Sequence, residues 1–309
     1  MKPVLVAGEL NVDLILTGVD GLPVFGGEIL AQGLCKTPGS SSMICSMGLA
    51  KLGTAVRFVG RVGDDERGRY CVDALHRAGI DTAGVIVDDT LETGLTVALS
   101  SERDRALVTY PGAIAALAAD DVTDAALQGA SHLHVSSYFL QRRLRDGLPH
   151  LIARARLAGL SVSLDPGYDP DDMWGTDIGE VLPLLDVFLP NEVEACAIAG
   201  TDHVDDALRV LSGMCQTVVV KTGAKGCIGI DGEGIVRRVS AFLVQAVDTT
   251  GAGDSFDAGF LHAWLAHRPL DECMRWGAAC GALSTRALGG TPAQADTAEV
   301  RAMLEGIAA

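Results

Sequence analysis

Short runs of aliphatic residues recur along the chain, and most of them are separated by stretches with helical periodicity. These runs occupy residues 4–7, 56–60, 133–135, 160–164, 187–189 and 218–220. Such a run is typical of a strand that is buried on both faces of a parallel sheet. One intervening helix is predicted by the apolar repeat Leu140, Leu144, Leu148 and Ile152. Together, the alternating strands and helices predict an α/β fold with a mostly parallel central sheet and helices on both faces.

Two regions, at about 13–37 and 90–112, have extended patterns without an intervening helix. In the second region, Leu95, Val97 and Leu99 alternate with small or polar residues, and another extended run follows a polar turn at 101–104. This pattern predicts a half-buried antiparallel hairpin. Ligands of open α/β sheets bind outside the carboxyl ends of the strands, where a small added sheet would act as a lid. We therefore expect a single α/β domain over 1–309 with a lid inserted at these two regions.

Charge and composition narrow the possible partners. The 309 residues include 24 basic and 40 acidic side chains, which give a formal net charge of −16 and argue against binding to nucleic acid or to anionic membranes. The sequence contains no uncharged apolar run of the length that spans a bilayer. Eight cysteines without a CxxC pair indicate reduced thiols, and Glu9 and Asp13 interrupt any signal-peptide core. We expect a cytoplasmic protein.

The strongest chemical signal is the segment 248–260, DTTGAGDSFDAGF. Gly251, Ala252 and Gly253 lack bulky side chains and precede a helical apolar stripe, so a glycine-rich turn is predicted to open a helix. Amides at such a helix start have no partner within the helix and, together with the helix dipole, favour phosphate binding. Asp254 lies in the first helical turn, where a carboxylate is also common as a simple cap.

This segment resembles the C-terminal signature of the ribokinase/PfkB carbohydrate kinase family. Four further segments resemble the family in order along the chain: GELNVDLIL at 8–16, VGRVGDDERG at 59–68, PNEVEA at 190–195 and VVVKTGAKG at 218–226. The resemblance spans nearly the whole chain. It implies a ribokinase-like three-layer sandwich with a small β-sheet lid. It also implies an ATP-dependent sugar kinase, a phosphotransferase with an alcohol group as acceptor.

The resemblance also implies roles for individual residues. Asp254 would be the general base, beside an anion hole at Gly251, Ala252 and Gly253. The amides of Ala252, Gly253 and Asp254 would stabilise the charge on the phosphoryl oxygens. The sugar would be bound by Asn11, Asp13, Gly39, Ser40 and Arg105. Nucleotide contacts are implied for Asn191, Lys221, Gly223, Gly226 and Ala279.

Two cation sites follow from the same resemblance. Asn191 and Glu194 would hold Mg²⁺ through water, although an Asn followed three residues later by Glu is also a capping box. Asp248 and Thr250 would hold a monovalent cation, with the loop 285–293 supplying the second half of the site, so stimulation by K⁺ over Na⁺ is expected. The small residues at 276–284 suit either an adenine pocket or tight helix packing.

One departure leaves the substrate open. In GSSSMICSMGLAKLG, at 39–53, Ser40, Ile44 and Ser46 replace the Gly, Asn and Ala that family members have near the sugar. The alternatives are therefore a nucleoside or sugar-phosphate kinase of the same family, or a non-catalytic regulator that binds sugar or nucleotide. The sequence lacks GxxxxGK[ST], HExxH and GxSxG motifs. Pairing of lid strands is expected to produce a homodimer.

Overall fold

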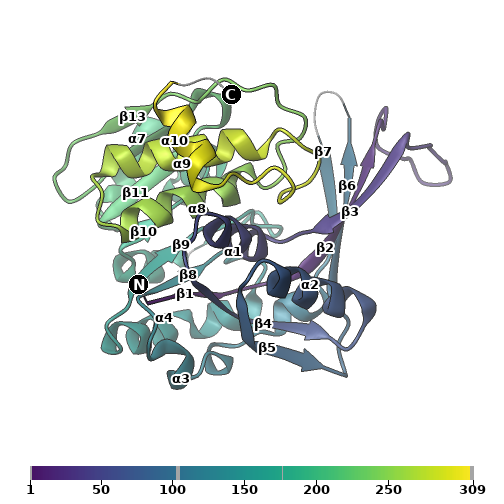
Figure 1. Cartoon of the computed structure of the whole chain (residues 1–309), viewed down its shortest axis with the longest axis horizontal. Helices are drawn as coiled ribbons and strands as arrows, with labels where there is room; N and C mark the ends of the chain where they lie inside the picture. The colour runs from purple at the N-terminus through teal and green to yellow at the C-terminus, as the bar shows by residue number, and fades with distance from the viewer. Residues whose placement is uncertain (1, 102–104, 176, 307–309) are drawn as a thin grey trace.

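A computed structural model describes residues 2–101, 105–175 and 177–306. Its central feature is a nine-stranded sheet with the strand order β13-β12-β11-β10-β9-β8-β1-β4-β5 (Figure 1). The strands are β1 (Val4–Ala7), β4 (Val56–Gly63), β5 (Asp81–Asp88), β8 (His132–Val135), β9 (Ser161–Leu164), β10 (Val187–Phe188), β11 (Thr217–Lys221), β12 (Cys227–Ile230) and β13 (Arg237–Val239). The strands from β5 to β11 in this order, including β1, pair with one another in parallel, and β12 and β13 are added antiparallel at the edge next to β11. The predicted mostly parallel sheet is confirmed.

Helices cover both faces of this sheet and give three layers. One face carries α1 (Ser41–Lys51), α2 (Glu66–Arg77), α8 (Ala252–Leu265), α9 (Leu270–Ser284) and α10 (Thr297–Leu304). The other carries α3 (Asp124–Leu127), α4 (Arg142–Leu157), α5 (Ile178–Val181), α6 (Glu192–Ala199) and α7 (Val204–Ser212). The predicted apolar stripe of α4 is buried at Leu144, Leu148 and Ile152, whereas Leu140 precedes the helix and lines a cavity. Each face therefore has its own hydrophobic core.

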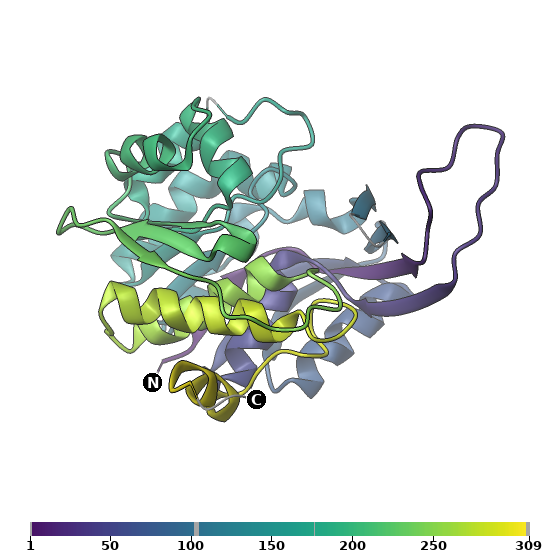
Figure 2. The same cartoon turned by 90° about the horizontal axis from the view of Figure 1, so that it is seen from above.

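A second, four-stranded sheet stands beside the main body in the order β3-β2-β6-β7 (Figure 1). It consists of β2 (Asn11–Thr17), β3 (Gly33–Pro38), β6 (Gly94–Ser100) and β7 (Arg105–Tyr110). Strands β6 and β7 form the predicted antiparallel hairpin, while residues 102–104 of its predicted turn lie outside the described residues. The segment 18–32 between β2 and β3 extends away from the rest of the molecule (Figure 2).

The strand order places a crevice beside β1. The chain leaves β1 towards β4 on one side and later builds β8 to β11 on the other side. At such a switch point, the loops that follow the strands diverge and leave a crevice at the carboxyl edge. The segments after β1, β8, β9 and β10 all line one cavity at this edge.

No helix within the described residues is long and apolar enough to cross a membrane.

Candidate active site

The glycine-rich turn opens α8 as the sequence predicts. Gly251 has a φ of 71°, and a Cβ added there would lie 2.7 Å from Gly290 Cα, so both conformation and space require glycine. Gly253 and Asp254 are the second and third residues of α8, and their amides therefore have no acceptor within the helix. The amide of Ala252 donates to the carbonyl of Thr249 at 3.3 Å. The turn thus offers the amides of Gly253 and Asp254 to an anion, whereas the amide of Ala252, which was also predicted to take part, already has an acceptor.

Asp254 is partly buried at this helix start and lines a cavity of about 410 Å³. Burial raises the pKa of Asp254 to about 7; Asp165 raises it further, while Lys221 opposes the increase. A carboxyl group with such a pKa can accept a proton near neutral pH. The environment of Asp254 is therefore suited to a general base, and a surface helix cap would not need it.

The end of β1 and the start of β2 bring two predicted sugar-binding residues together. Asn11 is buried and its Nδ2 donates to Thr96 Oγ1 at 2.7 Å, whereas its Oδ1 has no hydrogen-bond partner among the described residues. Burial raises the pKa of Asp13 to about 7, with Arg105 opposing it. A Cβ on Gly39 would lie 2.0 Å from Asp13 Oδ1 and 2.4 Å from Asn11 Oδ1. Glycine at position 39 is therefore required by the close approach of these two side chains.

Ser40 lies at this site, but its hydroxyl group already forms hydrogen bonds within the protein. It caps α1 with a φ of 66°, accepts a bond from Met43 N and donates to the carbonyl of Glu9 at 2.7 Å. The Glu9 side chain is 2% exposed and accepts bonds from Ser42 N and Ser42 Oγ. Glu9 also lines the cavity, and the sequence analysis assigned it no role there. Its position directly after a buried strand, two residues before Asn11, was the signal that could have identified it.

Arg105 reaches from the small sheet to the segment before α8. Its Nη1 donates to Thr249 Oγ1 at 3.1 Å and to Thr250 Oγ1 at 3.2 Å, and it lies 3.9 Å from Asp248 Oδ1. Asp248 Oδ1 accepts bonds from the amide and hydroxyl of Thr250, and Oδ2 accepts one from Gly289 N at 2.8 Å. The structure therefore joins the two segments that were predicted to share a monovalent cation, and it joins the hairpin of β6 and β7 to them.

Asn191 and Glu194 form a capping box at the start of α6. Asn191 Oδ1 accepts a bond from Glu194 N at 2.9 Å, and Glu194 Oε2 accepts one from Asn191 N at 2.8 Å. Burial raises the pKa of Glu194 to about 8, and Asp165 adds to the effect. Both side chains line the cavity. The capping interpretation of this pair is therefore confirmed, and the same pair lines the cavity that contains Asp254.

Lys221 has buried partners that the sequence did not predict. Its Nζ donates to Asp165 Oδ2 at 2.8 Å and to both carboxylate oxygens of Asp257 at 3.1 Å. Asp165 follows β9, whereas Asp257 lies one helical turn after Asp254 on α8. Because these residues are 56 and 36 positions from Lys221, only the fold brings them together.

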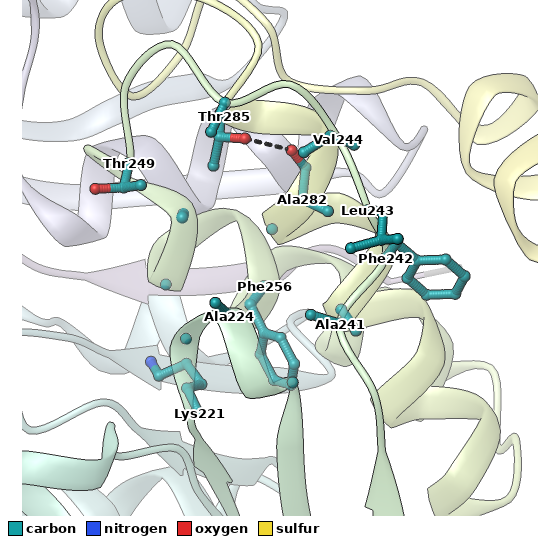
Figure 3. A pocket seen from close by; sticks show the side chains of 17 residues that line it. Lys221, Ala224, Ala241, Phe242, Leu243, Val244, Thr249, Phe256, Ala282 and Thr285 are labelled. Atoms are coloured by element: carbon teal, nitrogen blue, oxygen red, sulfur yellow. Dashed lines mark hydrogen bonds between the residues drawn. The ribbon is translucent and has the colours of Figure 1, made fainter.

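A second cavity, of about 320 Å³, lies between α8, α9 and the segment that follows β13 (Figure 3). The predicted residues Lys221, Gly223 and Gly226 line it. Ala279 does not fit its predicted role, because it is fully buried in the hydrophobic core. Helix α9 instead presents Ala278, Gly281 and Ala282, and the residue that caps its C-terminus, Thr285, also lines the cavity. The small residues of α9 therefore serve both cavity and packing, on different faces of the helix.

The two cavities meet at the anion hole. Both are lined by Lys221, Gly223, Thr249 and Gly253. The cavity of about 320 Å³ is largely apolar on the α9 side and includes Phe256, whereas the cavity of about 410 Å³ carries Asn11, Asp13 and Asp254. A group bound at the amide of Gly253 would lie at the junction, next to Asp254.

Comparisons with known proteins agree with this arrangement. The family described as pfkB family carbohydrate kinase matches residues 1–297. The chain is 31% identical over 293 residues to an ATP-dependent ribose-1-phosphate kinase of Halopiger xanaduensis, and the match covers 92% of each chain. A double variant of Vibrio cholerae fructokinase, solved with fructose, ADP and potassium ion, has a TM-score of 0.84 at 27% identity over 98% of both chains. Arabidopsis thaliana ribokinase, solved with ribose and ATP, has a TM-score of 0.84 at 26% identity, over 98% of this chain and 99% of that one.

These matches confirm the ribokinase-like fold that the motifs implied. The family match extends over nearly the whole chain, and the relative from Halopiger xanaduensis is matched over almost its full length. The chain belongs to the pfkB family of carbohydrate kinases and is a phosphotransferase that acts on an alcohol group.

Proposed function

We propose that this kinase transfers the γ-phosphoryl group of ATP to a hydroxyl group of a small, uncharged sugar or sugar-like molecule, with Asp254 as the general base. The observation that carries this proposal is the junction of the two cavities at Gly253, with Asp254 beside it. ATP in the apolar cavity and a sugar in the polar cavity would bring the γ-phosphate and the acceptor hydroxyl to the same point. Positioning of this kind is the main requirement of phosphoryl transfer.

In this mechanism, Asp254 accepts the proton of the sugar hydroxyl as the hydroxyl oxygen attacks the γ-phosphorus. The bond between the γ-phosphorus and ADP breaks, and ADP leaves. The pKa of about 7 supports this role, because the carboxylate is available at neutral pH and is still a useful base. The amides of Gly253 and Asp254 stabilise the charge that collects on the phosphoryl oxygens. A closed lid, formed by the small sheet of a single α/β domain, excludes water that would otherwise accept the phosphoryl group.

Magnesium and a monovalent cation are part of the proposal. Asn191 and Glu194 offer amide and carboxylate oxygens, the ligands that Mg²⁺ prefers, and their mutual hydrogen bonds leave contact through water as the natural mode. Mg²⁺ would neutralise charge on the phosphates. Asp248 and Thr250 offer oxygens for K⁺ next to the anion hole, together with the loop that contains Gly289.

The charge of the sugar-side cavity favours an uncharged substrate. Glu9, Asp13 and Asp254 line this cavity. Among the lining residues that the structure describes, the cations are Arg105 and Lys221. Lys221 is paired with Asp165 and Asp257, and Arg105 is directed towards the 248–250 segment. A phosphate or carboxylate on the substrate would therefore lie beside three acidic side chains. The free acceptor Asn11 Oδ1 suits a hydroxyl donor.

A homodimer in the cytoplasm completes the proposal. The small sheet and the 18–32 segment expose large apolar side chains, among them Phe25, Leu30, Leu34 and Val108. A second copy of the chain would cover them. The eight cysteines are free, as expected in a reducing compartment. Light scattering of the wild type and of Leu34→Glu at micromolar concentration tests the dimer, and a wild-type monomer would contradict it.

A substrate panel tests the function. Neutral sugars, nucleosides, sugar acids and sugar phosphates are each supplied with Mg²⁺ and ATP, and ADP release is measured. We expect turnover with a neutral sugar and little with phosphorylated or carboxylated ones. Preferential use of a sugar phosphate would overturn the assignment of an uncharged substrate. ATP binding without turnover across the panel would favour a non-catalytic regulator.

A further inference from the structure

Lys221 is the centre of a buried charged cluster directly beneath the anion hole. Its side chain is 10% exposed, and those of Asp165 and Asp257 are 7% and 1% exposed. A Cβ added to Gly253 would lie 3.6 Å from Lys221 Nζ, so the ammonium group lies against the backbone of the anion hole. The three hydrogen bonds of Lys221 go to carboxylate oxygens of the protein.

The cluster ties three elements together at the point where α8 begins. Lys221 is the last residue of β11, Asp165 follows β9, and Asp257 belongs to α8. Asp165 also accepts a bond from Gly167 N at 2.9 Å, which fixes its own position. Since Asp257 is three residues after Asp254, a bond to Asp257 restrains the turn of helix that carries Asp254 and the amide of Gly253.

The charges in the cluster balance one another. Burial opposes ionisation of Lys221, but Asp165 and Asp257 hold its pKa well above its usual value. Lys221 and local hydrogen bonds overcome burial and lower the pKa of Asp165, whereas burial raises that of Asp257. One ammonium therefore faces two buried carboxyl groups whose pKa values are shifted in opposite directions. Oxygens of Asp165, Asp254 and Asp257 lie within 4.8 Å of one another, so removal of this ammonium would leave Asp165 uncompensated beside Asp254.

We propose that Lys221 is a positioning residue, whose ammonium group fixes the first turns of α8 against the ends of β9 and β11 and balances the charge of Asp165 beside Asp254. This inference rests on the proposed role of Asp254 as base. The sequence predicted a nucleotide contact for Lys221, and the experiments below distinguish the two roles.

The ionisable and polar groups around Asp254 determine how the removal of Lys221 would change the pKa of Asp254. They are Asp165, Lys221, Ser41, Glu9, Asp257, Glu194 and Cys45. After burial, Asp165 is the largest influence that raises the pKa of Asp254, and Lys221 is the largest that lowers it. The base acts in its deprotonated form, so activity is lost as the pH falls through this pKa. Without Lys221 the pKa rises, and the loss of activity moves to higher pH.

Lys221→Met tests this inference through the pH profile of kcat/KM. We expect the acid limb to move upwards by about 1 to 3 pH units, the range that a neighbouring opposite charge typically contributes. At pH 7, kcat should fall about tenfold or more, while the KM for ATP changes little. Lys225→Met is the matched control, because Lys225 is exposed on the same turn and pairs with Glu192; it should leave the profile unchanged.

A second substitution separates electrostatics from simple damage to the fold. Asp165→Asn removes the charge that Lys221 balances, so alone it should move the acid limb to lower pH, and together with Lys221→Met it should return the limb towards its original position. If Lys221→Met does not fold, Asp165→Asn still tests the balance. A raised KM for ATP with an unmoved acid limb would identify a nucleotide contact and overturn the inference. If Asp254→Asn retains turnover, the proposed base is wrong instead, so the two failures are distinguishable.

Discussion

The two cavities that meet at Gly253 are built in different ways. The cavity beside α9 is lined mainly by apolar groups, which include small residues such as Ala282 and larger ones such as Leu243 and Phe256 (Figure 3). The cavity beneath the small sheet is formed by buried polar side chains, including Asn11 and Asp13. Apolar side chains select by shape, whereas buried polar groups select by hydrogen bonding and charge. Changes on each side should therefore affect the KM of one substrate, and changes at the junction should affect kcat.

Asp254→Asn should have the largest effect, because Asp254 lies at the junction. Asparagine keeps the size of the side chain but cannot accept the proton of the hydroxyl group. Loss of a general base typically lowers the rate by roughly 10²- to 10⁴-fold, or about 3 to 5 kcal/mol. We expect kcat to fall by this amount, with ATP affinity nearly unchanged because the amides and the apolar cavity remain. Steady-state kinetics and calorimetric titration of ATP measure the two quantities.

A thermal unfolding curve is the control for that variant. A midpoint close to that of the wild type would show that the helix cap is intact and that the loss is chemical. Turnover within a few-fold of the wild type would mean that Asp254 only caps α8. In that case the junction of the two cavities would have no general base, and the expectation that changes at the junction lower kcat would be wrong.

Asn11→Ala should separate the sugar side from the nucleotide side. The substitution removes the unpartnered acceptor Oδ1 and the bond to Thr96. Loss of a buried hydrogen-bonding partner costs about 1 to 3 kcal/mol, so we expect the KM of the sugar to rise about 10- to 100-fold. The KM of ATP should change little. Thr96→Val, which leaves the acceptor but frees the Asn11 amide, should give a smaller increase, and an equal rise in both KM values would contradict the division.

Ala282→Phe should give the opposite result on the α9 side. The larger side chain would project into the nucleotide cavity, and overpacking of a formed site costs about 1 to 3 kcal/mol. We expect the KM of ATP to rise about tenfold or more, with the KM of the sugar nearly constant. Ala302→Phe on α10, at a half-buried position, is the control for the added ring itself. A larger effect on the sugar than on ATP would reverse the assignment of the cavities.

The sequence predicted most of the fold because the signals for it are local. Aliphatic runs marked the parallel strands, and the alternation at 95–99 marked the hairpin of the small sheet. The glycine-rich turn could also be predicted from the sequence, since only glycine combines the φ of Gly251 with the close approach of Gly290. Strand bounds differed by a few residues, as at β4, which continues to Gly63 beyond the predicted residue 60.

The parts that the sequence did not predict depend on contacts between distant residues. Nothing local distinguishes Asp165 and Asp257 as partners of Lys221, because three separate elements must assemble before the cluster exists. Ala279 was chosen from a run of small residues, and only the packed helix decides which of them face the cavity. Glu9 follows a buried strand and could have been identified by its place beside Asn11.

Replacement of Na⁺ by K⁺ should give the smallest effect, and it concerns the region that both cavities share. Asp248 and Thr250 precede the anion hole, and Asp248 also binds Gly289 N across the site. A loop built from oxygens at fixed positions favours a cation whose size matches the opening, and a cation there would strengthen the positive potential at the Gly253 amide. We therefore expect K⁺ to raise kcat a few-fold over Na⁺ at equal ionic strength while both KM values change little. Asp248→Asn should abolish the difference between the salts. Equal rates in the two salts for the wild type would show that a monovalent cation has no part in the mechanism. A change confined to the KM of ATP would show that the cation acts on nucleotide binding and not at the junction of the cavities.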